Sequence, residues 1–430
     1  MQDPMGTGAT PTTYALGLSR RQLLATGSVA AVGAGLGSGG SVREANAQQA
    51  APSGGAPAAQ QQKGPQHLKF PGKDEGLVVL GDRPLVAETP ESLLDDDTTP
   101  TAKFFIRNNG IPPETVDVDK WEFVIDGEVD KPVKFTITEL KSKFPNVTRR
   151  LVLECGGNGR SFYSPPARGN QWTNGGVGCA EWTGVRLSDV LKAAGVKKSA
   201  KFTGHYGADG HLSGEAGKVS LSRGVPIKKA MDENNLLVWA MNGQPLPIIH
   251  GGPLRLIVPG WPASVSAKWV TRVWVREKEH DGPGMGGTSY RVTINPMVPG
   301  GKTDEKNFRD LESMPVRSIV TSPANGTKLA AGTRELKLRG ASWAGDRAVK
   351  FVDVSTDYGA TWVRAKLSPP KNKYDWQRWT ASVKVPSDGY YEIWSRATDT
   401  ANVAQPHVAA NWNPQGYGAN PMHRIAVLIG

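Results

Sequence analysis

Residues 151–160 read Leu151-Val152-Leu153-Glu154-Cys155-Gly156-Gly157-Asn158-Gly159-Arg160, a buried-type strand that runs directly into a glycine-rich turn. The turn presents the Cys155 thiol at the carboxyl end of the strand, where backbone amides can face a ligand. Three interpretations of this thiol remain open from the residues alone. They are a disulfide with Cys179, a buried inert thiol, and a metal-ligating thiolate that the nearby Arg160 cation would stabilise.

The segments around this motif combine several strands with few helices. Apolar runs predict strands at residues 121–127, 151–153, 236–241 and 254–260. The pattern of Leu187 to Ala194 predicts a helix that stops at Gly195, and Thr138-Glu139-Leu140 is typical of a capped helix start. We expect residues 68–98 to be loop-like. Because the helices do not alternate regularly with the strands, the predicted fold class of residues 101–313 is α+β with a mixed sheet.

The pattern changes after Met314. Strand-like segments then recur at intervals of roughly ten residues, with Gly, Asn and Pro turns between them and no convincing helix. Examples are residues 351–355, 361–363 and 390–394. This spacing is typical of an immunoglobulin-like sandwich. We therefore expect a second, all-β domain at residues 314–430.

Composition excludes several classes of protein. The chain has 430 residues, a formal net charge of +11 and two cysteines, and its length suits two or three domains. Two cysteines exclude a disulfide-dense scaffold, a cysteine-rich zinc module and an all-cysteine iron–sulfur cluster. No Cys-x-x-Cys-His motif occurs, so we expect no haem of the c type in this chain. The positive charge suits an anionic ligand or an acidic partner, and the absence of a basic run argues against nucleic acid.

The beginning of the chain has the features of an export signal. Ser19-Arg20-Arg21-Gln22-Leu23-Leu24 is a twin-arginine pattern, and Ala45-Asn46-Ala47 offers a cleavage site after a short apolar run. We therefore predict a twin-arginine signal peptide at residues 1–47, a linker and irregular segment at residues 48–100, and a periplasmic location. The apolar run is too short and too rich in glycine to span a membrane, and we expect no membrane span elsewhere.

The glycine-rich turn resembles the Cys-x-Gly-Asn-x-Arg motif of the sulfite oxidase family of molybdenum enzymes. The resemblance covers most of residues 100–430 in order, through the segments Gly169–Trp172, Trp182–Leu191, Met241–Pro247, His250–Arg255, Val258–Gly260 and Lys268-Trp269. It implies a mixed α/β molybdopterin domain followed by an immunoglobulin-like dimerisation domain. The C-terminal half shares the pattern of that second domain, including Trp412-Asn413 and His423-Arg424-Ile425.

The resemblance also implies roles for particular residues. Cys155 takes the position of the molybdenum ligand. The substrate pocket would be formed by Arg107, Arg160, Trp172 and Tyr290. The pterin would be contacted by Phe105, Ile106, Arg107, Asn108, Asn109, Asp209, His250, Arg255, Ser266, Ala267 and Lys268. An anionic pterin phosphate suits the cations in that set.

Three positions depart from the family pattern. Gln415 stands where sulfite oxidases carry a third pocket arginine, Asn109 stands in place of a histidine, and Ser289 stands in place of an acidic residue. Losing a cation from an oxyanion pocket weakens the binding of a small dianion such as sulfite, and it can make room for a larger sulfur species. The segments Cys155–Arg160 and Gly178–Trp182 are most similar to the molybdoprotein subunit of bacterial sulfane dehydrogenases.

The resemblance therefore implies a periplasmic molybdenum oxidoreductase that oxidises a protein-bound sulfane sulfur in thiosulfate oxidation. A c-type cytochrome subunit would accept the electrons, a sulfur-carrier protein would bear the substrate, and the chain would form a homodimer through residues 314–430 within a hetero-oligomer. A sulfite dehydrogenase acting on free sulfite is the alternative. An exported binding protein without a metal is a hypothesis of another class. We expect Cys179 to be a buried, small hydrophobic residue.

Overall fold

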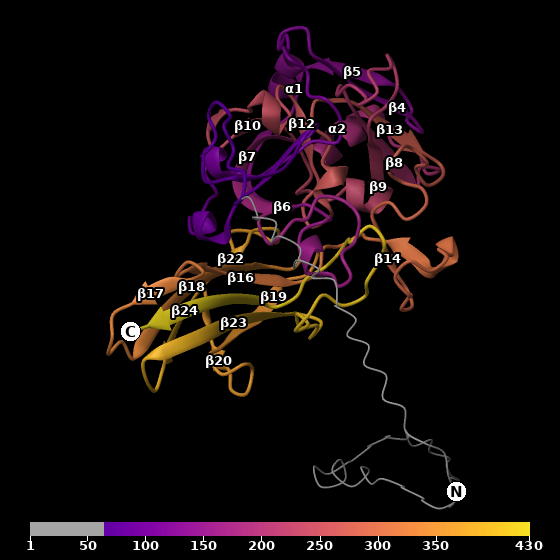
Figure 1. Ribbon diagram of the computed structural model, residues 1–430. Helices are drawn as coiled ribbons and strands as arrows, with labels where there is room; N and C mark the ends of the chain where they lie inside the picture. The colour runs from indigo at the N-terminus through magenta and orange to yellow at the C-terminus, as the bar shows by residue number, and fades with distance from the viewer. Residues whose placement is uncertain (1–63) are drawn as a thin grey trace, which may run out of the picture. The chain divides into compact units, whose positions relative to one another are not determined.

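The computed structural model describes residues 64–430, which belong to one compact unit. The predicted signal peptide at residues 1–47 and the first part of the predicted linker lie outside the described residues. The predicted domain boundary at residues 313 and 314 falls between strands β15 (Phe308–Asp310) and β16 (Arg317–Ser322) (Figure 1). No helix within residues 64–430 is long and apolar enough to cross a membrane.

Two five-stranded sheets form the framework of the first half. One has the order β11-β10-β7-β6, with β12 also paired to β10, and the other has the order β5-β4-β13-β8-β9. The strands of the first sheet are β6 (Asn146–Glu154), β7 (Val177–Arg186), β10 (Leu236–Met241), β11 (Gln244–Pro245) and β12 (Arg255–Ile257). Those of the second are β4 (Glu122–Gly127), β5 (Val133–Thr136), β8 (Phe202–Gly207), β9 (Ser222–Pro226) and β13 (Val270–Arg276). Because β4 and β13 run parallel while their other neighbours run antiparallel, the predicted mixed sheet is confirmed.

The helices are few and follow local capping signals. Helix α2 (Leu187–Ala194) ends at Gly195, whose φ of 70° is the left-handed conformation that glycine adopts without a Cβ clash. Helix α1 (Ile137–Lys143) begins slightly earlier than we expected. Thr136 is its N-cap, and Thr136 and Glu139 form a complete capping box. A third helix, α3 (Ile227–Ala230), is a single turn.

The N-terminal part of the described chain is more regular than we expected. We expected residues 68–98 to be loop-like, but they contain β1 (Val78–Asp82) and β2 (Leu85–Glu88), which pair antiparallel. Strand β2 also pairs with β3 (Ile106–Arg107). This correction has a physical reason, since the two short apolar runs flank a tight turn and each is stabilised only by a partner strand. The small sheet fixes the position of Arg107.

The C-terminal half is the expected all-β sandwich (Figure 1). One sheet has the order β16-β18-β22-β21 and the other the order β17-β24-β23-β19-β20. Besides β16, the strands are β17 (Thr327–Leu329), β18 (Glu335–Trp343), β19 (Val349–Ser355), β20 (Val363–Arg364), β21 (Lys366–Leu367), β22 (Gln377–Lys384), β23 (Gly389–Asp399) and β24 (His423–Ile429). Between the halves, β14 (Arg291–Thr293) pairs with β15 in a separate hairpin.

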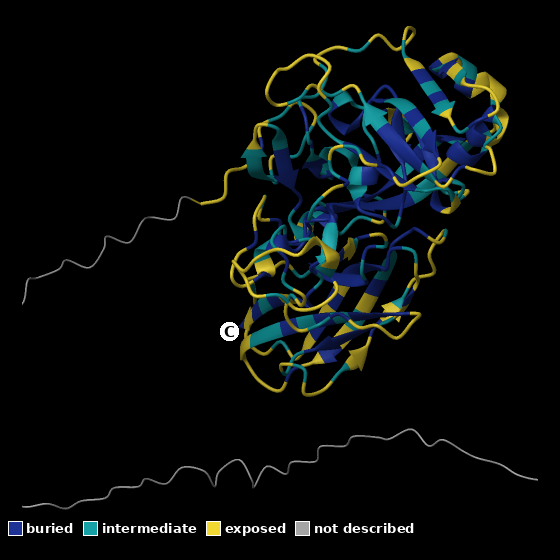
Figure 2. Cartoon of the chain, turned by 90° about the vertical axis from the view of Figure 1, so that its right-hand side faces the viewer, coloured by how far each residue is buried: buried dark blue, intermediate teal, exposed yellow. Residues whose placement is uncertain are grey.

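Buried residues form the cores of both halves, and Figure 2 colours them dark blue along the strands. In the first half, Val190 and Leu191 of α2 pack with Phe123 and Val273 of the second sheet. A third cluster joins the halves, because Val152 and Cys179 pack with Trp343 and Trp376 of the sandwich. The strand that leads to Cys155 therefore rests partly on the sandwich.

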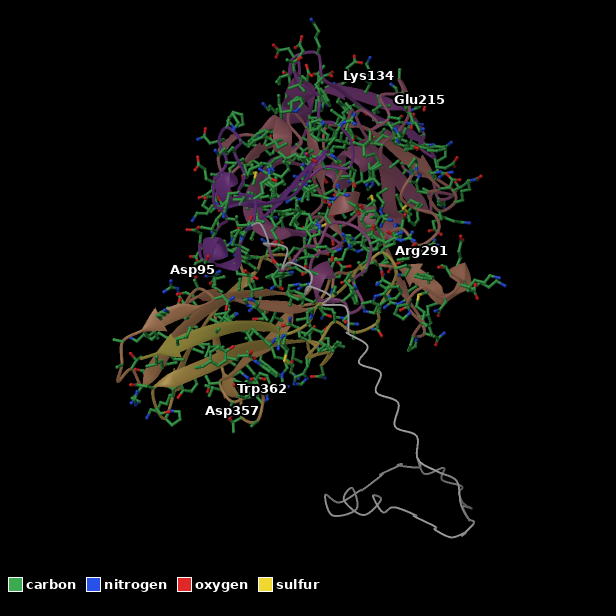
Figure 3. The ribbon with its side chains drawn as sticks, in the orientation of Figure 1. Asp95, Lys134, Glu215, Arg291, Asp357 and Trp362 are labelled. Atoms are coloured by element: carbon green, nitrogen blue, oxygen red, sulfur yellow. The ribbon has the colours of Figure 1, made fainter. Side chains whose placement is uncertain are left out.

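Ion pairs strengthen this junction. Arg150 binds Asp375 with its Nη2 2.6 Å from the carboxylate, and both side chains are largely buried. Asp95, labelled in Figure 3, accepts hydrogen bonds from Arg339 and Arg378 of the sandwich. The pair between Arg317 and Glu154, 2.8 Å apart, is completely buried and lies next to Cys155. The two halves therefore form a single structural support for the turn.

Candidate active site

Cys155 is a buried, free thiol at the end of β6. Its amide donates to the carbonyl of Gly176 at 2.8 Å, and its carbonyl accepts from the amide of Asn158 at 2.9 Å. Cys179 is also free, so the disulfide interpretation is wrong. The Cys179 thiol is fully buried and donates to Asp375 at 3.4 Å, and burial raises its pKa. Cys179 therefore packs in the core of the domain junction, whereas Cys155 lines a cavity.

The empty space in this cavity, counted together with its mouth that is open to solvent, is about 750 Å³. It brings together most of the residues that the sequence singled out, namely Phe105, Arg107, Asn108, Asn109, Cys155, Asp209, Arg255, Ser266, Ala267, Lys268 and Tyr290. Ile106, Arg160, Trp172 and His250 do not line it. Its wall also includes residues that we did not predict, namely Phe104, Gly156, His205, Gly207, Leu221, Arg223, Ala263, Ser264 and Trp269.

One end of the cavity contains a buried cation, Arg255, and a half-buried one, Lys268, with few counter-charges. The Lys268 ammonium donates to the Asn108 side chain at 2.6 Å and to the Ile249 carbonyl at 2.7 Å. Burial lowers the pKa of Lys268 well below its usual range, and Arg255 and Arg107 lower it further. Burial likewise lowers the pKa of Arg255 to about 9. The arrangement therefore favours the binding of these cations to an anionic ligand that is not part of the protein.

Arg255 gives the most direct evidence that an anionic ligand belongs in the cavity. Its Nη1 donates to the carbonyl of His250 at 2.8 Å, but its buried Nε has no hydrogen-bond partner within residues 64–430. Asp209 is the acidic side chain on the cavity wall, and burial raises its pKa. An unpartnered guanidinium nitrogen beside a cation cluster fits a phosphate or another oxyanion.

Two basic residues, His250 and Lys73, lie behind the cavity wall at the end that contains Arg255 and Lys268. Burial lowers the pKa of His250 well below its usual range, and the neighbouring Lys73 cation lowers it further. The Lys73 ammonium lies 3.0 Å from His250 Nε2 and donates to the carbonyls of Thr101 and Phe104. Since an ammonium only donates, His250 Nε2 is the acceptor and the ring is neutral. Burial lowers the pKa of Lys73 to about 7.

The Cys155 end of the cavity combines a cation with an aromatic hydroxyl. Arg107 lines the wall, and its guanidinium forms no hydrogen bond or ion pair within the described part of the chain. The Tyr290 hydroxyl donates to Asn109 Oδ1 at 3.5 Å. Tyr290 has a φ of 52°, an uncommon conformation for a residue with a side chain, and such positions cluster at functional sites.

Two expected pocket residues lie behind the wall. The Arg160 guanidinium donates to the carbonyls of Gln415 at 2.7 Å and Asn170 at 2.9 Å. Trp172 is fully buried and packs edge-to-face against Phe105, with the two ring centroids 5.9 Å apart. The indole Nε1 of Trp172 has no hydrogen-bond partner among the described residues. Arg160 and Trp172 therefore support the wall in this structure and do not form it.

Gln415 does not reach the cavity either. Its side-chain amide donates to Thr288 Oγ1 at 3.3 Å, and its carbonyl accepts the hydrogen bond from Arg160. Gln415 stands where sulfite oxidases carry a third pocket arginine, and in this chain its carbonyl serves to hold Arg160. The predicted departure from the family pattern thus removes a cation without placing another polar group on the wall.

Arg223 is the main cavity residue that sequence reasoning missed. It lies on β9 directly opposite His205 of β8, and its Nη1 donates to the Gly284 carbonyl at 2.6 Å. Burial lowers the pKa of Arg223, and its Nε has no partner within residues 64–430. Strand register brings Arg223 to the cavity, and no local motif marks it.

The cavity therefore fits the expected cofactor. A buried free thiol beside a cation suits a thiolate that ligates a metal. At the other end, Arg255 and Lys268 offer donors to the phosphate of a pterin. Residues of this chain therefore account for the binding of the metal at one end of the cavity and of the pterin phosphate at the other.

Comparisons with known proteins agree with this geometry. The model of the oxidoreductase molybdopterin binding domain matches residues 109–284, and that of the Mo-co oxidoreductase dimerisation domain matches residues 309–429. Sulfite oxidase of Gallus gallus is 33% identical over 365 residues, which cover 82% of this chain and 78% of that protein. Mitochondrial sulfite oxidase of Homo sapiens is 33% identical over 373 residues, covering 84% and 67%.

A solved structure is similar over much of its length. The sulfane dehydrogenase SoxCD from Paracoccus pantotrophus matches with a TM-score of 0.66 and 26% identity, covering 84% of this chain and 87% of the matched one. The predicted architecture, a molybdopterin domain of the sulfite oxidase type followed by a β-sandwich, is thereby confirmed. The chain therefore belongs to the sulfite oxidase family and is an oxidoreductase with a molybdenum–molybdopterin cofactor.

Proposed function

We propose that this enzyme oxidises a sulfane sulfur carried on a cysteine persulfide of a partner protein, as a step of thiosulfate oxidation, and passes the electrons to a c-type cytochrome. Similarity to sulfite oxidases and to a sulfane dehydrogenase supports chemistry on sulfur compounds. Oxidation of free sulfite is the alternative.

The observation that carries the choice of substrate is the environment of Gln415. A small dianion binds best where several cations converge. Here Gln415 replaces one such cation, and the Arg160 guanidinium is occupied by two main-chain carbonyls. Arg107 is left as a free guanidinium in the cavity that Cys155 also lines. This environment favours a larger sulfur species with less charge over sulfite.

The cofactor is assigned to the residues of the cavity as follows. Cys155 supplies the thiolate ligand to molybdenum. The pterin and its phosphate would lie against Arg255, Lys268 and Asn108, with Phe105, Asn109, Asp209, Ser266 and Ala267 on the same cavity wall and Ile106 and His250 supporting it from behind. Bound there, the cofactor supplies two-electron oxidation with transfer of oxygen derived from water.

The chain's own residues bind and orient the substrate. Arg107 stabilises the negative charge that grows on sulfur-bound oxygens, since a cation already held in place needs no reorganisation. The Tyr290 hydroxyl, 3.5 Å from Asn109 Oδ1, holds or moves a proton beside the reacting sulfur. Arg160 and Trp172 keep the turn and Phe105 in place from behind.

Two measurements test this function. Metal analysis of the wild type should find molybdenum, and Cys155→Ser should lose it, whereas Cys179→Ser should keep it. Cytochrome reduction should then be measured with free sulfite and with a persulfidated carrier protein. Rapid turnover of sulfite at low concentration, with none of the carrier, would overturn the sulfane assignment in favour of the alternative.

The proposed location and assembly follow from the sequence and the domain type. We place the enzyme in the periplasm, exported by the twin-arginine signal at residues 1–47, and as a homodimer through residues 314–430 that binds a cytochrome subunit. The match to a dimerisation domain supports the homodimer. Fractionation of cells that express the Arg20→Lys, Arg21→Lys double variant tests export, and enzyme that still reaches the periplasm would contradict it.

A further inference from the structure

Two tyrosine rings are stacked beside the Cys155 turn. The centroids of the Tyr290 and Tyr417 rings lie 4.7 Å apart with an interplanar angle of 22°. The Arg223 guanidinium lies 4.4 Å from the centroid of Tyr290, and the Arg160 guanidinium lies 5.2 Å from the centroid of Tyr417. Because Tyr417 occupies one face of the Tyr290 ring, Arg223 must occupy the other. The four side chains form one continuous stack, with a cation at each end.

The backbone holds Tyr417 firmly in this stack. Its amide donates to Asn413 Oδ1 at 3.0 Å, and its carbonyl accepts from the Tyr163 hydroxyl at 3.1 Å and from the Asn413 side chain at 2.9 Å. The next amide, that of Gly418, donates to the carbonyl of Gly156 at 3.0 Å. Tyr417 is thus fixed to the same turn that presents Cys155.

Both rings lie close to the backbone of the Cys155 turn. A Cβ atom placed on Gly156 would lie 3.3 Å from Cδ1 of Tyr290 and 3.6 Å from Cδ1 of Tyr417. By contrast, the hydroxyl of Tyr290 has a single long hydrogen bond, to Asn109 at 3.5 Å. Contacts to the ring, and not bonds to the hydroxyl, therefore set where this hydroxyl points.

We infer that Tyr417 is a positioning residue for Tyr290, which fixes the hydroxyl of Tyr290 in the cavity by stacking against its ring. Tyr417 does not line the cavity and acts only through its neighbour. The inference rests on the proposed role of Tyr290 in the reaction. It assigns to Tyr417 a part in catalysis that the sequence did not indicate.

A double-mutant cycle tests this role. Tyr417→Leu should lower kcat about 10-fold with little change in KM, because a displacement of roughly 1 Å in a reacting group has effects of this size or larger. In the Tyr290→Phe background the same change should cost less than about two-fold, since the hydroxyl it positions is absent. Equal losses in both backgrounds would indicate a general structural role and overturn the inference.

Two further variants complete the test. Tyr417→Phe keeps the ring and should restore most of the kcat lost in Tyr417→Leu; if it is as slow as Tyr417→Leu, the hydroxyl of Tyr417 acts directly and the inference is wrong. Tyr358→Leu makes the same change at an exposed tyrosine of the sandwich and controls for nonspecific effects.

The test does not depend on which substrate is correct. The cycle is run with sulfite or with the persulfidated carrier, whichever the wild type oxidises. If the wild type oxidises neither, the proposed function fails, and a crystal structure of Tyr417→Leu still decides the inference. A Tyr290 ring displaced from its position would support it, and a ring that stays in place would refute it.

Discussion

Buried cations occur in two regions of this molecule, and their surroundings differ. At the domain junction, Arg150, Lys229 and Arg317 each lie within 2.8 Å of a carboxylate, from Asp375, Asp346 and Glu154. In the cavity, the buried cations donate mainly to backbone carbonyls and amide side chains, and Arg255 Nε has no partner in the described chain.

The difference separates structural charges from functional ones. A buried ion without a counter-ion destabilises a fold, whereas a paired one is close to neutral for stability. The junction cations therefore hold the halves together. The cavity cations lower stability until an anionic ligand arrives, and that makes them the signature of the cofactor site.

The largest effect is expected at the junction. Arg317→Met leaves Glu154 buried without its counter-ion and should lower the free energy of unfolding by about 3–5 kcal/mol. Arg334→Met, which breaks the exposed pair with Asp388, should cost less than about 1 kcal/mol. Urea denaturation of both variants measures this, and similar losses would remove the distinction between buried and exposed pairs.

The cavity cations should behave in the opposite way. Arg255→Met removes an uncompensated buried charge, so the cofactor-free protein should become more stable. Cofactor retention should weaken by about 10- to 100-fold, the loss expected for a hydrogen bond to a charged group. Urea denaturation of apoprotein and molybdenum analysis after dialysis provide the two readouts. An apoprotein destabilised as much as Arg317→Met would show that Arg255 is a structural charge.

The pH dependence of stability sharpens the comparison further. In the folded apoprotein the pKa of Lys73 is lowered to about 7, while in the unfolded chain it keeps its ordinary value of about 10.4. The unfolded state therefore binds more protons between these values, and stability should rise as pH increases from about 7 to 10.

Lys73→Met should flatten this rise. The measurement is the urea midpoint of apoprotein at pH 7 and pH 9 in wild type and variant. Bound cofactor should also flatten the profile, because an anion nearby favours the charged ammonium. A wild-type profile that falls over this range would contradict the buried state of Lys73.

The smallest effect is expected at Gln415. Gln415→Arg adds a cation near the Cys155 end, so kcat/KM for sulfite should increase about three- to ten-fold, within the usual value of one hydrogen bond. The increase requires the new side chain to point into the cavity and away from Thr288, to which Gln415 donates a hydrogen bond. No change would show that an arginine at this position does not reach the pocket.

Local signals predicted much of the fold. Neighbouring residues predict the glycine that ends α2, and Gly195 has the positive φ that such a helix end needs. The Cys155 turn was found for the same reason, because its strand and its glycines are contiguous. The hairpin of β1 and β2 was missed, since its short strands depend on β3 for support.

The candidate site was predictable only where a motif carried its residues. Lys73, Arg223 and Tyr417 reach the site from distant segments through sheet pairing and domain packing, and nothing in their local sequence distinguishes them from surface residues. Arg160 and Trp172 were found, but a motif does not say which side of a wall a side chain occupies.

The attachments of the Cys155 turn have a consequence for how the enzyme is made. Arg317, Gln415 and Gly418 all bind residues 154–160, and they come from the last third of the chain. Residues up to Gly418 must therefore be synthesised before all of these bonds can form. The Cys155 turn reaches its final shape only when the sandwich segments are present, so the folding of the turn is coupled to that of the second half.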